Sequence, residues 1–273
     1  EKLQLCPDQY AKCAKMKIIS LGLGIQSTAM YLMSSLGQID RADYAIFADP
    51  GAELPDTYEL WDSLNTWREN NNGIPLIKKR KSLYDDLIKS QNSRGKRFAP
   101  IPAFTESQGM VRRQCTGEYK INVVVQEVRK LHGLKKRQRM KPTEMWLGIS
   151  LDEIQRMKES RLYNIDYKYP LIEQRMTRSG CVRFLEEHGF HNVKKSSCTF
   201  CPFHNNSNWK EIKRDYPDEW EKVIKVDRVI RDSSNRGLDD KLYLHRTLVP
   251  IEFVYLQEDQ EELFICEEGY CGI

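Results

Sequence analysis

The stretch that decides the fold is SLGLGIQSTAM, residues 20–30, which joins the apolar run MKIIS, residues 16–20, to an amphipathic segment. Gly22 and Gly24 have no side chain and can adopt positive φ, so the turn can present its N–H groups to a ligand that approaches closely. The first turn of the following helix directs its free N–H groups and positive dipole end at the same point. Two interpretations follow, a phosphate-binding turn or an ordinary strand-to-helix turn capped by Ser27.

The rest of the first half alternates between apolar strands and periodic helices. We predict strands at 16–20, 43–49, 73–79 and 143–150, and helices at 27–37, 54–71 and 117–133. This alternation predicts an α/β fold with a doubly wound parallel sheet. Ligands bind beyond the carboxyl ends of such strands, and both SLGLGIQS and ADPGAE, residues 48–53, fall at these ends. The agreement favours phosphate binding.

Changes in composition along the sequence suggest that the chain has three parts. Residues 1–15 do not continue the first strand and read as an N-terminal extension or a cloning remnant. Residues 16–168 form the predicted nucleotide-binding domain. Residues 169–273 are richer in Cys and His, and several stretches have helical periodicity. We therefore predict a smaller, mostly helical, cysteine-bearing C-terminal part.

Composition and charge narrow the class of protein. The 273 residues are 40% apolar and 30% charged, which is ordinary for a globular chain. No apolar run has the length of a membrane span, and the N-terminus lacks the order of a signal peptide. We expect a cytoplasmic protein with no membrane partner.

Basic residues gather in four clusters although the net charge is only +4. The clusters lie at residues 77–81, 94–97, 111–113 and 135–141. Each alone is typical of a solvated loop. Several on one face would attract a phosphate backbone, which makes DNA or RNA a candidate partner.

The chain has eight cysteines without the spacing of an extracellular disulfide framework. Cys198 and Cys201 form a CxxC followed by Pro202, a spacing that lets two thiolates reach one metal centre. Four thiolates suit either a [4Fe–4S] cluster or a structural Zn²⁺.

Six motifs taken in order resemble the signature of the phosphoadenosine phosphosulfate (PAPS) reductase family, which belongs to the adenine nucleotide α-hydrolase-like PP-loop superfamily. They are SLGLGIQSTAM, FADPGAELPDTYEL, RRQCTGEYKI, WLGISLDEIQR, YPLIEQ and CTFCPFH. The resemblance implies a PP-loop fold, sulfur chemistry and binding of an adenine nucleotide. This nucleotide would be ATP, adenosine phosphosulfate (APS) or PAPS. Two departures stand out: the loop lacks the lysine and aspartate of the Ser-Gly-Gly-Lys-Asp-Ser variant, and Ser150 replaces an expected arginine.

The resemblance also implies the site residues. The nucleotide would be bound by Ser20, Gly22, Gly24, Gln26, Ser27, Thr28, Asp49, Gly51, Glu53, Arg113, Lys120 and Gly148. Asp49 and Glu53 could in addition hold Mg²⁺, which prefers hard oxygen ligands. The metal ligands would be Cys115, Cys181, Cys198 and Cys201, with a [4Fe–4S] cluster favoured by the sulfur chemistry and Zn²⁺ as the alternative. A buried structural thiol is the other interpretation of Cys181.

The C-terminal CEEGYCGI resembles the cysteine-bearing tail of sulfonucleotide reductases, and this likeness makes Cys271 a candidate nucleophile. A redox pair of Cys266 with Cys271, or two inert tail thiols, are the alternatives. Three function hypotheses remain: nucleotide-activated sulfur transfer to nucleic acid, reduction of APS or PAPS to sulfite, and a non-catalytic nucleotide- or DNA-binding module with a structural zinc. Either enzyme would need an electron or sulfur donor protein.

Overall fold

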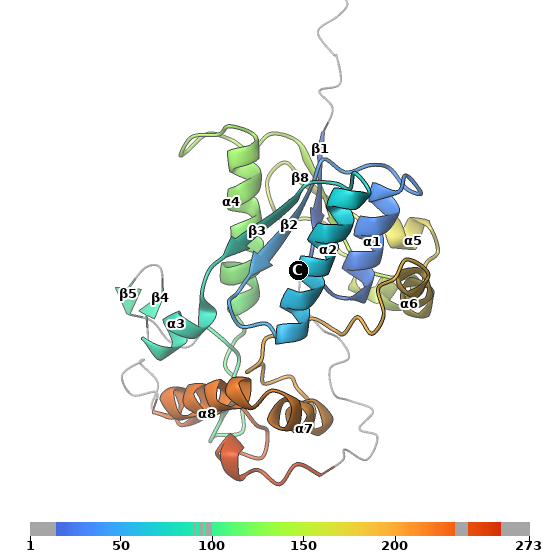
Figure 1. Cartoon of the computed structure of the whole chain (residues 1–273). Helices are drawn as coiled ribbons and strands as arrows, with labels where there is room; N and C mark the ends of the chain where they lie inside the picture. The colour runs from blue at the N-terminus through green and yellow to red at the C-terminus, as the bar shows by residue number, and fades with distance from the viewer. Residues whose placement is uncertain (1–14, 90, 93–94, 97–99, 233–239, 258–273) are drawn as a thin grey trace, which may run out of the picture.

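A five-stranded parallel sheet forms the centre of the computed structural model, which describes residues 15–89, 91–92, 95–96, 100–232 and 240–257 (Figure 1). Its order is β3 (Leu76–Arg80), β2 (Tyr44–Asp49), β1 (Met16–Ser20), β7 (Thr143–Leu147) and β8 (Ile165–Lys168). Every neighbouring pair is parallel. The predicted α/β class with a doubly wound parallel sheet is confirmed.

Helices cover both faces of the sheet because successive strand residues point to opposite sides. Ile19 and Phe47 pack with α1 (Ile25–Ser35), α2 (Pro55–Asn70) and α6 (Arg178–Glu187). Ile18 and Ile46 pack on the other face with α4 (Asn122–Leu131). Strand residues of alternating orientation thus build two separate apolar cores.

The sequence analysis placed most of these elements and missed others. The first helix begins at Ile25, two residues earlier than predicted, and strand β8 was not predicted. The helix expected over 117–133 is divided into a π-helix, η1 (Thr116–Ile121), and α4. Such π turns occur frequently at functional sites.

A third apolar core lies beyond the carboxyl end of the sheet. It is built from α3 (Leu83–Ile88), α7 (Asn206–Asp215), α8 (Pro217–Arg231), β9 (Leu242–Tyr243) and the 3₁₀ helix η4 (Ile251–Phe253). Tyr119 of η1 and Phe200 also belong to it. By contrast, α5 (Pro170–Glu173) and α6 contact α1, so the predicted C-terminal part contributes to two different cores.

Short elements complete the described chain. They are β4 (Gln91–Asn92), β5 (Gly95–Lys96), β6 (Phe104–Thr105), which pairs with β9, and the 3₁₀ helix η2 (Leu151–Arg156) after β7. Within the described residues, the helices are too short or too polar to cross a lipid bilayer.

Candidate nucleotide cleft and cysteine cavity

The left-handed backbone conformation in the turn between β1 and α1 does not fall on either of its glycines. Leu23 has a φ of 56°, whereas Gly24 is extended and caps the helix with a φ of −98°. The Oγ of Ser27 accepts a hydrogen bond from the Gly24 N–H and donates to the Gly24 carbonyl, each at 3.2 Å. A Cβ at Gly24 would lie 3.6 Å from the backbone N of Ser196, which is an ordinary van der Waals distance, so this position has room for a small side chain.

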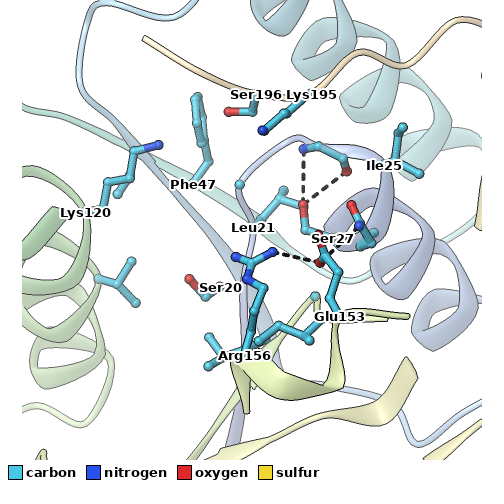
Figure 2. A pocket seen from close by; sticks show the side chains of 18 of the residues that line it. Ser20, Leu21, Ile25, Ser27, Phe47, Lys120, Glu153, Arg156, Lys195 and Ser196 are labelled. Atoms are coloured by element: carbon cyan, nitrogen blue, oxygen red, sulfur yellow. Dashed lines mark hydrogen bonds and ion pairs between the residues drawn. The ribbon is translucent and has the colours of Figure 1, made fainter. Parts of the chain in front are cut away.

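A cleft opens beside this turn at the carboxyl ends of β1, β2 and β7 (Figure 2). Seven of the residues predicted to bind nucleotide line it: Ser20, Gly22, Gly24, Gln26, Ser27, Lys120 and Gly148. The sequence analysis did not assign four further lining residues, Arg156, Arg178, Lys195 and Ser196. Arg156 belongs to a motif that the resemblance already marked, so only the other three carried no sequence signal.

The lining of the cleft is positively charged. Lys120, Arg156, Arg178 and Lys195 face it together with one carboxylate, Glu153. Glu153 accepts hydrogen bonds from Arg156 Nη1 at 2.7 Å and from Gln26 Nε2 at 3.3 Å (Figure 2). Cations in a recessed, partly apolar site attract an anion more strongly than they would in open water. The cleft therefore suits a phosphorylated ligand.

Other predicted nucleotide residues lie outside the lining of the cleft. Thr28 is fully buried, and its hydroxyl has no hydrogen-bond partner among the described residues. Asp49 is 1% exposed, and its Oδ1 accepts hydrogen bonds from the Gly51 N–H at 2.7 Å and from the Tyr58 hydroxyl at 2.9 Å. This carboxylate also raises the pKa of Tyr58, after the larger effect of burial.

Glu53 is a buried residue that contacts two of the side chains lining the cleft. Its side chain is 0% exposed, and its two oxygens contact Lys120 Nζ at 3.2 Å and Ser196 Oγ at 3.0 Å. Neither Glu53 nor Asp49 lines the cleft, and both carboxylates accept hydrogen bonds from protein donors. Glu53 instead fixes two cleft-lining side chains in place.

The same residue leads to the cysteines. Glu53 forms an isolated antiparallel bridge with Cys198, and the Thr199 N–H donates to the Ala52 carbonyl at 2.7 Å. Cys115, Cys198 and Cys201 line one small cavity, together with Arg113 and Lys120. Lys120 lines both the cleft and this cavity, so the two recesses share a wall.

The fourth predicted ligand, Cys181, lies elsewhere. It is fully buried on α6 in the core that packs against α1, and it does not line the cavity of the other three cysteines. Burial is the main cause that raises the pKa of its thiol to about 12. The structure therefore brings three predicted cysteines to one cavity and places Cys181 in a different core.

The cavity brings together three thiols, the residue type that binds either a [4Fe–4S] cluster or Zn²⁺. Within the described part of the chain, no group of three or more His, Cys, Asp or Glu side chains is arranged to hold one metal ion. Cys266 and Cys271, the predicted tail thiols, lie outside the described residues.

The contacts of Glu53 give a first prediction. A double-mutant cycle of Glu53→Ala and Lys120→Ala should give a coupling of about 1 to 3 kcal/mol, because the pair is largely shielded from water. Chemical denaturation of the four proteins measures it. The exposed pair Lys17 and Asp40, at 2.7 Å, is the matched control and should show coupling close to zero. Equal coupling in the two pairs would contradict the structural role of Glu53.

Comparison with known proteins adds one structural likeness. No protein-family model matches the sequence, and no curated protein matches it. Among solved structures, the U34-tRNA thiolase NcsA from Methanococcus maripaludis, with its [4Fe–4S] cluster, is similar over 78% of this chain and 70% of that chain. The sequence identity is 13% and the TM-score 0.39. A likeness at this level assigns no function to the present chain.

Proposed function

We propose that the chain is a PP-loop enzyme that binds an adenine nucleotide in the cationic cleft and transfers sulfur to a nucleic acid. One observation carries the proposal: Glu53 joins the cleft to the cysteine cavity, and Lys120 lines both. Nucleotide activation and sulfur transfer need adjacent sites. The activated atom of the substrate must be attacked by the sulfur nucleophile before water can hydrolyse it.

The residues of the cleft have a defined part in this reaction. Transfer of the adenylyl group of ATP to an oxygen of the nucleic acid releases pyrophosphate and makes that oxygen a leaving group. Attack by a sulfide-level sulfur, supplied as hydrosulfide by the sulfur donor, then displaces the oxygen as AMP, and no atom changes its oxidation state. Lys195, Arg178 and the N–H groups at the start of α1 would hold the phosphates and balance their charge. Gln26 is held toward the cleft by Glu153.

The cysteine cavity would hold the cofactor. Cys115, Cys198 and Cys201 are the residues placed to bind a [4Fe–4S] cluster, which when bound supplies redox or sulfur-carrying chemistry beside the nucleotide. Arg113, whose guanidinium lies 5.7 Å from the centre of the Phe203 ring, lines the same cavity and adds positive charge next to the thiolates.

A second reaction, reduction of APS or PAPS to sulfite, has one specific observation in its favour. Ser150 replaces the expected arginine and is buried, but Arg156 and Arg178 both line the cleft. Two arginines from other segments can thus supply the positive charge that a sulfonucleotide needs. The assay must therefore include both substrate classes.

The deciding experiment uses protein purified without oxygen. Sulfur transfer predicts ATP turnover stimulated by bulk tRNA or by genomic DNA, and sulfur in the nucleosides or linkages recovered after digestion. Release of labelled sulfite from APS or PAPS would support reduction instead. ATP binding with no turnover in any of these mixtures would overturn both enzymatic proposals.

Lys195 gives a prediction specific to the cleft. Lys195→Ala should weaken ATP binding about tenfold, since an ion pair or charged hydrogen bond to phosphate is lost at a partly exposed position. Isothermal titration measures the change. Lys225→Ala, which removes the same charge from the exposed face of α8, should leave the affinity unchanged. Equal ATP affinities for the two variants would show that Lys195 does not bind the nucleotide.

A further inference from the structure

The loop between α4 and β7, residues 132–142, is the most basic surface segment described. From Arg129 to Lys141 the chain has seven Lys and Arg residues and no Asp or Glu. The loop leads into Thr143, which pairs with Met16 at the start of β1. It therefore lies at the amino edge of the sheet, beyond the C-terminal end of α4 (Figure 1).

This loop is held in one shape by its own hydrogen bonds. Arg129 of α4 donates from Nη2 to the carbonyls of Lys135 at 3.0 Å and Gln138 at 2.9 Å. Gln138 in turn accepts from the Lys135 N–H at 2.6 Å. Met140 is buried, and its carbonyl accepts from Asn164 Nδ2 at 2.8 Å. Basic residues that are only solvated by water do not require hydrogen bonds that hold the backbone of their loop in one conformation.

The scaffold displays cations that have no carboxylate partner. Lys136, Arg137 and Arg139 are exposed and form no ion pair with any described residue. Arg137 is in the left-handed region with a φ of 69°, which is unfavourable for a residue with a side chain. Like charges this close repel one another. Ordered, strained and unneutralised cations together point to an anionic partner.

The basic surface continues toward the cleft. Glu127 of α4 is 10% exposed and contacts Lys130 at 3.2 Å and Lys79 of the edge strand β3 at 3.4 Å. Next along that strand is Arg80, which lies over the turn at Gly51, where a Cβ would meet its Nε at 3.0 Å. The loop, α4 and β3 thus connect the amino edge of the sheet with the turn at Gly51.

We propose that this loop binds the phosphate backbone of the nucleic-acid substrate, at a point distant from the reacting atoms. The inference rests on the proposed function and adds the surface that the substrate occupies. The ten residues of α4 separate the loop from the cleft by about 15 Å. A substrate that contacts both must be a structured nucleic acid several nucleotides long, and a mononucleotide or dinucleotide would not reach the loop.

Salt-dependent binding tests the proposal directly. The variant K136A/R137A/R139A should bind bulk tRNA or a 30-base-pair DNA duplex at least tenfold more weakly than the native protein, by fluorescence anisotropy. The slope of log affinity against log salt should become less negative by up to about 2.7 for duplex DNA. ATP binding should not change. The control R161A/R183A/K225A removes the same charge from exposed positions on other elements and should behave as the native protein.

The outcomes separate this inference from the proposed function. Equal affinity and slope in the two triple variants would overturn the inference, as would absence of nucleic-acid binding by the native protein at low salt. Loss of binding specific to the loop variant would support it even if no sulfur transfer were found, because anisotropy needs no turnover. Loss of binding to tRNA alone, or to DNA alone, in the loop variant would identify which of the two is the substrate class.

Discussion

Replacing Gly148 with alanine is expected to abolish nucleotide binding. A Cβ at this position would lie 2.7 Å from the backbone N of Ser27, 2.8 Å from the Ser27 Cα and 3.1 Å from the carbonyl carbon of Gln26. All three are atoms of the first turn of α1, which cannot rotate away as a side chain could. The end of β7 and the start of α1 would have to separate, at a cost of about 1 to 3 kcal/mol.

The displaced turn, at Gln26 and Ser27, lines the cleft. We therefore expect ATP affinity to fall more than a hundredfold for Gly148→Ala, while circular dichroism shows that the chain still folds. Gly117→Ala is the matched control, because a Cβ there meets nothing within 4 Å. Titration calorimetry and thermal melting on both variants check the prediction. Native affinity in Gly148→Ala would mean that the ligand does not use this turn.

The fold could be predicted because its signals are local. SLGLGIQSTAM places a strand, a turn and a helix within a few residues, and the short apolar runs of β2 and β7 are typical of buried parallel strands. Strand β8 was missed because only Ile165 of its four residues is buried, which leaves little apolar periodicity to detect. The π turn of η1 was missed because helical periodicity does not distinguish it from an α-helix.

Part of the candidate site follows from motifs that the resemblance marked. The turn residues Gly24, Gln26 and Ser27 line the cleft, and so do Lys120 and Gly148 from two later motifs. Lys195 and Arg178 reach the same cleft from segments far along the chain, and a lysine or arginine on an unremarkable helix or loop carries no sequence signal. The left-handed Leu23 was also unforeseen, because glycine is the usual residue in that conformation.

Glu53 shows why a residue type does not fix a role. An acidic residue after a strand suggested a Mg²⁺ ligand, since carboxylates are the ligands that Mg²⁺ prefers. In the fold the carboxylate turns inward and is satisfied by Lys120 and Ser196. The change follows from the segment around Cys198, which pairs with the turn and closes it from solvent. Such long-range pairing has no signature in the local sequence.

The cysteines give the second large expected effect. Cys198→Ala should remove the metal content of the protein, whereas Cys181→Ala should leave it unchanged. Cys198 lines the shared cavity with Cys115 and Cys201, so its loss leaves two thiols in a recess built for more. Cys181 is buried on α6 among apolar side chains and does not line that cavity.

Iron, acid-labile sulfide and zinc per chain, measured on protein purified without oxygen, check this prediction. Matching iron and sulfide that persist in Cys181→Ala and vanish in Cys198→Ala would support a cluster held by the three-cysteine cavity. Alkylation of the metal-free native protein at pH 8 adds an independent readout, in which Cys181 stays unmodified until the chain is unfolded. Loss of metal in Cys181→Ala, at native stability, would show that α6 contributes a ligand after all. Zinc without sulfide, lost only in Cys198→Ala, would make the site structural and move the sulfur chemistry away from the cavity.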